Sequence, residues 1–269
     1  MTIPASFDSA VVEAIQARLD GIVAQGIAIP HAIESGSRAW GFPSPDSDYD
    51  CRFIYVRARD AYVTPWPPRD VIETPLDAVL DVNGWDAGKL IKLLLKGNAI
   101  AIEWLQSPIH YRFDPGFREL LLAFIAGHVD RDAVRRHYWY LGQRQWLPHA
   151  GDAEIAAKKL FYALRPAMAL RWLRLHPGER VAPMRFQALM AESDPPEALA
   201  AVANALIEAK AKALELGSIP MPEPVRAFVS EEFEATQRAL TDSERPVTTP
   251  EMREAAEALF REIVERYAP

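Results

Sequence analysis

Apolar and polar residues repeat with two different periods in the first sixty residues, and the change of period predicts a helix followed by strands. Over residues 7–24 apolar side chains recur at helical spacing, with Asp8 near the start, which predicts an amphipathic helix. Residues 27–34 and 49–56 are short apolar runs rich in β-branched and aromatic side chains, which is typical of strands. The chain is thus expected to begin with a helix and two strands.

The next part of the chain predicts further strands and short helices. After a proline-rich break at residues 65–68, residues 71–82 predict one or two short strands. Asp86 stands where a helix begins, and a second short helix is predicted over residues 99–106. These elements complete a mixed α/β unit that we expect to end near Pro108.

Beyond that point the apolar spacing is helical almost throughout, with breaks at clusters of proline and glycine. The triplet Thr249-Pro250-Glu251 is a good start for an amphipathic C-terminal helix. We therefore predict an α+β fold, with a small mixed-sheet domain over residues 1–108 followed by an all-helical domain over residues 109–269.

Composition places the chain among ordinary globular proteins. It has 269 residues, of which 49% are hydrophobic and 25% charged, and this length allows two domains with separate cores. Its single cysteine, Cys51, excludes an internal disulfide. The N-terminal residues lack the pattern of a signal peptide, and no apolar run approaches the ~20 residues that span a bilayer. We expect a cytoplasmic protein without a membrane partner.

Charge is distributed unevenly along the chain. The formal net charge is −7, which argues against a generally basic nucleic-acid binder. Residues 109–180, however, contain 12 Lys and Arg against 7 Asp and Glu, while the segments on either side are acidic. A positive surface of this kind suits a nucleoside triphosphate or RNA, and it suits a salt-bridged domain interface equally well.

Two carboxylates open the second predicted strand. Asp48 and Asp50 are two residues apart, so strand geometry places both on one face. Ionised carboxylates this close repel each other unless a cation lies between them, and the hard cation Mg²⁺ prefers oxygen ligands. The spacing therefore predicts a metal-binding pair. Arg52 follows on the same face and is a candidate structural partner of Asp50.

A glycine turn precedes this pair. The first apolar run ends at Ser35-Gly36-Ser37, where Gly36 frees the backbone to approach a ligand closely. Backbone N–H groups in such a turn, together with the Ser37 hydroxyl, can bind phosphate oxygens. We therefore expect a phosphate site beside the carboxylates.

The acidic segment has other interpretations. Because Asp and Ser are enriched in turns, residues 46–48 could form a solvated turn without further function. An EF-hand is excluded, since its sixth loop position would be Cys51 and its twelfth Arg57. An Asp-x-Asp pair also occurs in glycosyltransferases that hold a nucleotide-sugar through a metal, but those folds do not explain the Gly-Ser turn.

The order of these motifs resembles a known family. A Gly-Ser pair, ten residues and then Asp-Tyr-Asp, within residues 36–50, resemble the signature of the DNA polymerase β-type nucleotidyltransferase superfamily. The string GSRAWGFPSPDSDYDCRFIYV is similar to a prokaryotic branch, the predicted nucleotidyltransferases of the YcgL/RlaP type. The resemblance continues through residues 84–111 and 158–173, so it covers most of the chain. It departs at Ala99, where the branch leads us to expect Pro after Asn98.

The resemblance implies a third carboxylate on a later strand, flanked by apolar residues. Asp81, between Leu80 and Val82, fits this description best. Glu73 and Asp77 are weaker candidates. The resemblance also implies that the helical domain closes the cleft and contacts the nucleotide. Cationic and aromatic residues three or four positions apart on one helix are candidates for these contacts, although a solvated helix face is the alternative: Lys158, Tyr162 and Arg165, with Lys159 adjacent.

The reaction implied by the resemblance is transfer of a nucleoside monophosphate from a nucleoside triphosphate to an acceptor, with release of pyrophosphate. Two Mg²⁺ ions, or Mn²⁺ in their place, would assist it. Asp48 and Asp50 would bind both ions and Asp81 only one. Phosphate and nucleotide contacts would come from Gly36, Ser37 and Ser47.

The acceptor expected from the resemblance is an RNA end or a small molecule, and a protein acceptor ranks below both. A catalytically inactive nucleotide-binding module that acts through a partner is an alternative function. A metal-dependent glycosyltransferase is the other alternative.

Overall fold

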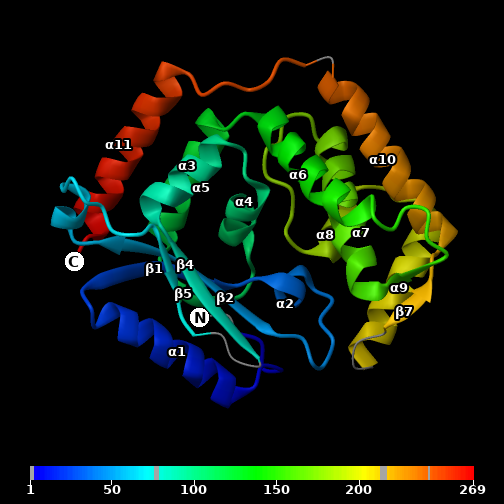
Figure 1. The fold of residues 1–269 in the computed structure, drawn as a ribbon, viewed down its shortest axis with the longest axis horizontal. Helices are drawn as coiled ribbons and strands as arrows, with labels where there is room; N and C mark the ends of the chain where they lie inside the picture. Colours follow the sequence, from blue (N-terminus) through cyan, green and yellow to red (C-terminus); the bar gives the residue numbers. More distant parts are fainter. Residues whose placement is uncertain (1–2, 76–78, 213–216, 242) are drawn as a thin grey trace.

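The computed structural model describes residues 3–75, 79–212, 217–241 and 243–269. A mixed five-stranded sheet with the order β3-β4-β2-β1-β5 forms one half of the molecule (Figure 1). Strands β2 and β4 run parallel, while the other neighbouring strands are antiparallel. The predicted α+β class with a mixed sheet is confirmed. The strands are β1 (Ile27–Glu34), β2 (Tyr49–Arg57), β3 (Val71–Glu73), β4 (Leu80–Asp86) and β5 (His110–Phe113).

Helix α1 (Ser9–Val23) covers one face of the sheet. Asp8 caps its N-terminus, because its carboxylate accepts a hydrogen bond from the backbone N–H of Ala10. Buried side chains of α1 pack with alternate residues of β2, among them Cys51 and Phe53. Since side chains alternate along a strand, Asp50 and Arg52 lie on the opposite face.

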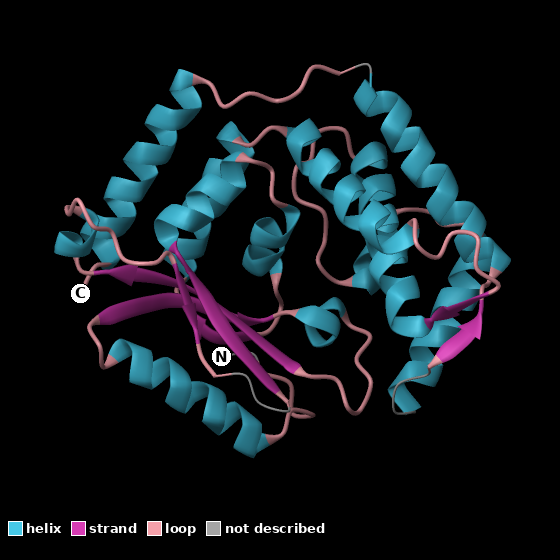
Figure 2. Cartoon of the chain, in the orientation of Figure 1, coloured by secondary structure: helices cyan, strands magenta, loops and turns pink. Residues whose placement is uncertain are grey.

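That opposite face is covered by four helices, which Figure 2 shows above the sheet. They include the last helix of the chain, so the C-terminal segment returns to the sheet. Asn98 and Thr249 cap two of these helices through side-chain oxygens that accept backbone N–H bonds. The four helices are α3 (Ala87–Leu95), α4 (Ala99–Gln106), α5 (Pro115–His128) and α11 (Pro250–Tyr267).

The other half of the molecule is mostly helical (Figure 1). It contains α6 (Arg131–Trp146), α7 (Ala157–Leu175), α8 (Phe186–Glu192), α9 (Glu197–Lys212) and α10 (Glu223–Thr241). Phe42, just after the short helix α2 (Gly36–Trp40), stacks on Phe161 of α7 with ring centroids 4.6 Å apart. This contact helps to hold the start of the acidic segment against α7. Within the described ranges, no helix combines the length and apolar character needed to cross a bilayer.

The division of the chain at residue 108 stays a prediction. Several contacts run across that boundary. Strand β5 lies beyond that residue yet pairs with β1, because its backbone completes the sheet edge. Helices α5 and α11 also pack with the sheet half. The helical half is not wholly helical, since β6 (Glu154–Ala156) pairs with β7 (Ser218–Pro220). A single cluster of buried residues links both halves.

Candidate active site

The parallel pairing of β2 and β4 places two predicted carboxylates side by side. Asp50 is the register partner of Asp81, so both side chains leave neighbouring strands at the same level. The Arg52 guanidinium bridges them: its Nη2 lies 2.9 Å from Asp50 Oδ1 and 2.7 Å from Asp81 Oδ2. Asn83 donates a further hydrogen bond to Asp81 Oδ1 at 3.1 Å. The structure therefore brings Asp50 and Asp81 together, with Arg52 supplying positive charge between them.

Gly36 lies against the Asp50 carboxylate. Its φ is +61°, a left-handed conformation that favours glycine. A Cβ atom at this position would lie only 2.1 Å from Asp50 Oδ2. A side chain at residue 36 would therefore displace the carboxylate, and glycine is required for both conformation and space.

Charge and burial act in opposite directions on Asp50. Burial raises the pKa of its carboxyl above the usual range, while the positive charge of Arg52 lowers it. The neighbouring negative charges of Asp81 and Asp48 raise the pKa further, and Lys158 lowers it. Asp48 is exposed and immediately precedes β2. Two carboxylates and two cations thus act on the pKa of Asp50.

Glu34, a buried acid that the sequence analysis missed, accepts a hydrogen bond from the backbone of this site. Glu34 ends β1 with no exposed surface; its Oε1 accepts the backbone N–H of Asp50 at 3.0 Å. Its Oε2 accepts the Tyr111 hydroxyl at 2.6 Å. Burial raises the pKa of Glu34 to about 7. The available signal was an acid ending an apolar run directly before the glycine turn.

The predicted phosphate-binding serines lie in a hydrogen-bonded loop. Ser37 Oγ donates to Ser47 Oγ over 3.0 Å, and Ser47 Oγ also accepts the backbone N–H of Ser44 at 2.9 Å. Arg38 fastens the same loop, because its Nη2 donates to the carbonyl of Ser47 at 2.6 Å and its Nε to that of Asp48 at 3.1 Å. These bonds fix the segment that leads into the acidic strand.

A pocket of about 390 Å³ opens beside Asp50, between the sheet and the helical half. Gly36 and Asp50 line it from the sheet side. Aromatic rings form much of its wall, among them the stacked pair Trp85 and Trp104, whose centroids are 3.8 Å apart. The volume and the mixture of aromatic walls with a few polar groups are typical of small-molecule sites. These two tryptophans were not singled out from the sequence.

The four predicted residues of α7 have different environments. Tyr162 lines the pocket and packs edge-on against Trp40, with centroids 5.7 Å apart. Lys158 is exposed and close enough for its charge to lower the pKa of Asp50. Lys159 donates instead to Gln145 Oε1 of α6 at 3.4 Å.

Arg165, the fourth, lines the pocket but is only 3% exposed. Its Nη1 lies 2.8 Å from Glu103 Oε1, which also accepts the Tyr138 hydroxyl at 2.9 Å. Its guanidinium donates as well to the carbonyl of Met184. The side chain is thus held in place by buried partners, a role that helix spacing alone did not predict.

The donor atoms of the site suit a divalent cation. Asp48, Asp50 and Asp81 provide carboxylate oxygens, which hard cations prefer, and the Gly36 cradle leaves room for the Asp50 carboxylate. Among the residues that the structure describes, no three acidic, His or Cys side chains are already clustered around a single point that would hold a metal. Of the weaker third candidates, Glu73 pairs with Arg69 on an outer strand, and Asp77 lies outside the described residues.

A comparison with sequence families agrees with this geometry. The profile described as the RNA repair pathway DNA polymerase beta family (RlaP) matches residues 11–262. The chain belongs to this family. The resemblance found in the sequence is thereby confirmed, and the family points to a polymerase β-like nucleotidyltransferase.

The chain is also similar to individual proteins. The chain is 37% identical over 214 residues to uncharacterized protein YcgL of Bacillus subtilis (strain 168), covering 80% of this chain and 82% of that protein. A solved structure of a nucleotidyltransferase-like protein from Exiguobacterium sibiricum 255-15 is 12% identical. That similarity spans 95% of this chain and 87% of the other, with a TM-score of 0.32.

Proposed function

We propose that this member of the family is a Mg²⁺-dependent nucleotidyltransferase. It transfers a nucleoside monophosphate from a nucleoside triphosphate to an acceptor oxygen and releases pyrophosphate. The main support is the parallel register that sets Asp50 beside Asp81, with Gly36 packed against the Asp50 carboxylate. Family membership makes nucleotide transfer the expected class of reaction.

The carboxylates provide the chemistry of the proposal. Asp48 and Asp50 would hold two divalent cations, and Asp81 would hold one of them. Such ions, when bound, neutralise charge on the attacking and leaving oxygens. Mn²⁺ has the same ligand preference and is an alternative. Arg52 orients Asp50 and Asp81, since its guanidinium contacts both carboxylates.

The triphosphate is proposed to lie between the glycine turn and α7. Gly36, Ser37 and Ser47 face its β- and γ-phosphates, while Lys158 adds positive charge near Asp50. Phosphoryl transfer depends mainly on positioning and charge neutralisation, and these contacts supply both. Arg165 lines the pocket and Lys159 adjoins Lys158, and both are proposed as further nucleotide contacts.

The aromatic pocket is the proposed place of the base. Tyr162, Trp85 and Trp104 line it, and a nucleobase is flat enough to stack against such rings. The pocket adjoins Asp50 directly, so a base bound there leaves the phosphates next to the carboxylates.

For the acceptor we propose an RNA end, because the description of the family names an RNA repair pathway. The excess of Lys and Arg over residues 109–180 is compatible with a polyanionic acceptor. A small-molecule acceptor is the second choice, and a protein acceptor ranks below it.

The test is Asp50→Asn in a transfer assay with labelled triphosphates, RNA oligonucleotides and a Mg²⁺ titration. Asn keeps the size of the side chain but removes the charge, so we expect transfer to fall by about a hundredfold or more. Asp60→Asn is the matched control, because Asp60 is exposed in the short 3-10 helix η1 (Arg59–Tyr62). Transfer by Asp50→Asn at the parent rate would remove the mechanism.

Calorimetry separates an inactive nucleotide-binding module from an enzyme. The proposal expects triphosphate binding to strengthen when Mg²⁺ is present, and turnover to follow. Tight binding that is independent of metal, without turnover on RNA or small-molecule acceptors, would instead support the inactive module.

A further inference from the structure

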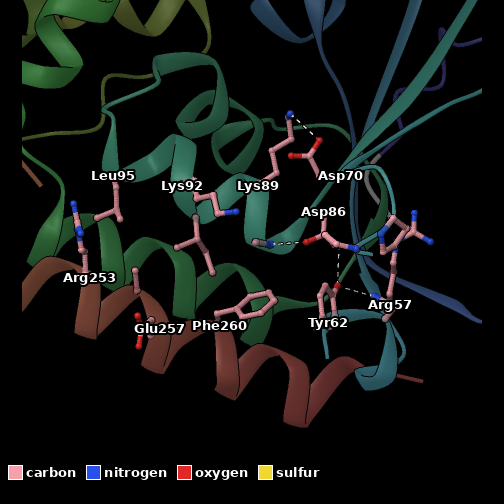
Figure 3. Close-up of a pocket in the computed structure, with 16 residues that line it drawn as sticks. Arg57, Tyr62, Asp70, Asp86, Lys89, Lys92, Leu95, Arg253, Glu257 and Phe260 are labelled. Carbon is pink, nitrogen blue, oxygen red and sulfur yellow. Dashed lines mark hydrogen bonds and ion pairs between the residues drawn. The ribbon is translucent and has the colours of Figure 1, made fainter. Parts of the chain in front are cut away.

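A second pocket lies at the far end of the same two strands that hold the carboxylates. It has a volume of about 420 Å³ and is bordered by the end of β2, the end of β4, α3 and α11 (Figure 3). Asp86, which lines it, is five residues beyond Asp81 on β4, about 16 Å away at the usual rise per residue. The volume falls in the range of small-molecule sites. This pocket is therefore separate from the proposed active site.

The inner walls of the pocket are largely apolar. Phe260 of α11 and Tyr62 meet edge to face, with centroids 5.0 Å apart and planes at 85°. Ile91 and Leu95 of α3 and Pro67 continue the surface. Tyr62 is fixed further, since its hydroxyl donates to Asp86 at 2.9 Å. An aromatic corner of this kind suits a flat apolar group.

Several charged groups around the pocket have partners, and Arg57 donates a hydrogen bond to the carbonyl of Arg69. Lys89 binds Asp70 at 3.1 Å, as Figure 3 shows, and Asp86 accepts hydrogen bonds from Tyr62 and the backbone of Gly88. Two further cations of the lining, Lys92 and Arg253, have no side-chain partner within the described ranges of the chain.

These two cations come from different helices and line the same pocket. Lys92 belongs to α3 and Arg253 to α11, and both are exposed. Glu257 of α11 also lines the pocket, and its Oε2 lies 3.7 Å from Arg261 Nη1. In a chain with a net charge of −7, a pocket edge with two unmatched cations favours an anionic ligand.

We propose that this pocket binds an aromatic phosphate. The flat ring packs against Phe260 and Ile91, and the phosphate lies between Lys92 and Arg253. The ligand is a small molecule bearing one aromatic system and one phosphate group, either a free nucleotide or a non-nucleotide aryl phosphate. The site is independent of the transfer reaction and does not rest on the proposed function.

The experiment titrates 1-naphthyl phosphate into the full chain by calorimetry, with inorganic phosphate and 1-naphthol as partial probes. We expect one site that binds the complete probe more tightly than either part. In Lys92→Ala/Arg253→Ala, affinity should fall by about tenfold or more for each lost charge-assisted contact. The matched control is Lys212→Ala/Arg238→Ala, which removes two exposed cations elsewhere.

A second variant tests the apolar wall. Ala61 is half-buried and lines the pocket, so Ala61→Phe fills part of the space and should also weaken binding. AMP distinguishes the two sources: a loss of AMP binding in the double variant indicates a nucleotide, and binding of the naphthyl probe alone indicates an aryl phosphate. Equal affinity of the parent chain and Lys92→Ala/Arg253→Ala would overturn the proposal. So would absence of saturable binding up to about 1 mM.

Discussion

Replacement of Gly36 by Ala tests the closest approach in the candidate active site. The new Cβ atom would lie 2.1 Å from Asp50 Oδ2, whereas ordinary contact begins near 3.4 Å. The carboxylate must therefore move by about 1.3 Å, the difference between these two distances. Asp50 cannot rotate away freely, because its other oxygen is ion-paired with Arg52 at 2.9 Å. The substitution thus acts directly on the proposed metal ligand.

Two effects of different size follow from this displacement. The left-handed φ of +61° at Gly36 costs an Ala residue about 1–2 kcal/mol of folding free energy. A catalytic group displaced by about 1 Å can lose about a hundredfold in rate. We therefore expect a modest loss of stability and a much larger loss of nucleotide transfer.

Gly26→Ala is the control that separates the two effects. Gly26 also has a positive φ, +76°, but a Cβ atom there meets nothing within 4 Å. Urea denaturation should show a similar loss of stability from backbone strain in both variants, with an additional loss at Gly36. The transfer assay should show a defect only in Gly36→Ala. Equal transfer rates in the two variants would refute the role assigned to the Gly36–Asp50 contact.

Three further predictions concern charge and stability. Arg52→Ala should raise the pKa of Asp50, as measured by NMR titration. It should also lower the free energy of unfolding by about 1–3 kcal/mol in urea denaturation, because it leaves a charged partner unpaired. Burial lowers the pKa of His31 from 6.5 to about 4, so the folded chain resists its protonation. As the pH falls from 6.5 to 4, the unfolding free energy of the parent should drop by up to about 3 kcal/mol more than that of His31→Gln, measured by urea denaturation across that range. Parallel pH profiles of the two proteins would contradict this. Arg165→Leu leaves the buried carboxylate of Glu103 without its cation, which should lower the free energy of unfolding by about 3–5 kcal/mol. Adding Glu103→Gln should restore part of that stability. No restoration would argue against the ion pair.

Local signals in the sequence predicted most elements of the sheet half. The first strand begins at Ile27 and ends at Glu34, as its apolar run indicated, and Asp86 caps the helix expected to begin there. Strand β5 was missed, because Pro108 was interpreted as an end of the domain and four residues give too little periodicity. Its place depends on pairing with β1, a contact distant in sequence.

The candidate site divides in the same way. Strand alternation led us to pair Asp48 with Asp50, and the structure places Asp48 just before β2. The choice of Asp81 came from the family resemblance, and the observed parallel register makes it adjacent to Asp50. Tertiary partners were not predictable from spacing. Arg165 shares helix α7 with Lys158, but the buried carboxylate of Glu103, on another helix, determines its environment.

The return of α11 to the sheet has a consequence for how the protein is made. Ile263 is fully buried, and the Tyr267 hydroxyl donates to Asp114 Oδ1 at 3.0 Å. The first half of the polypeptide therefore lacks part of its cover until α11 has left the ribosome. A recombinant fragment that stops after the fifth strand would expose apolar surface of α3 and the sheet to water. Expression work should accordingly retain α11.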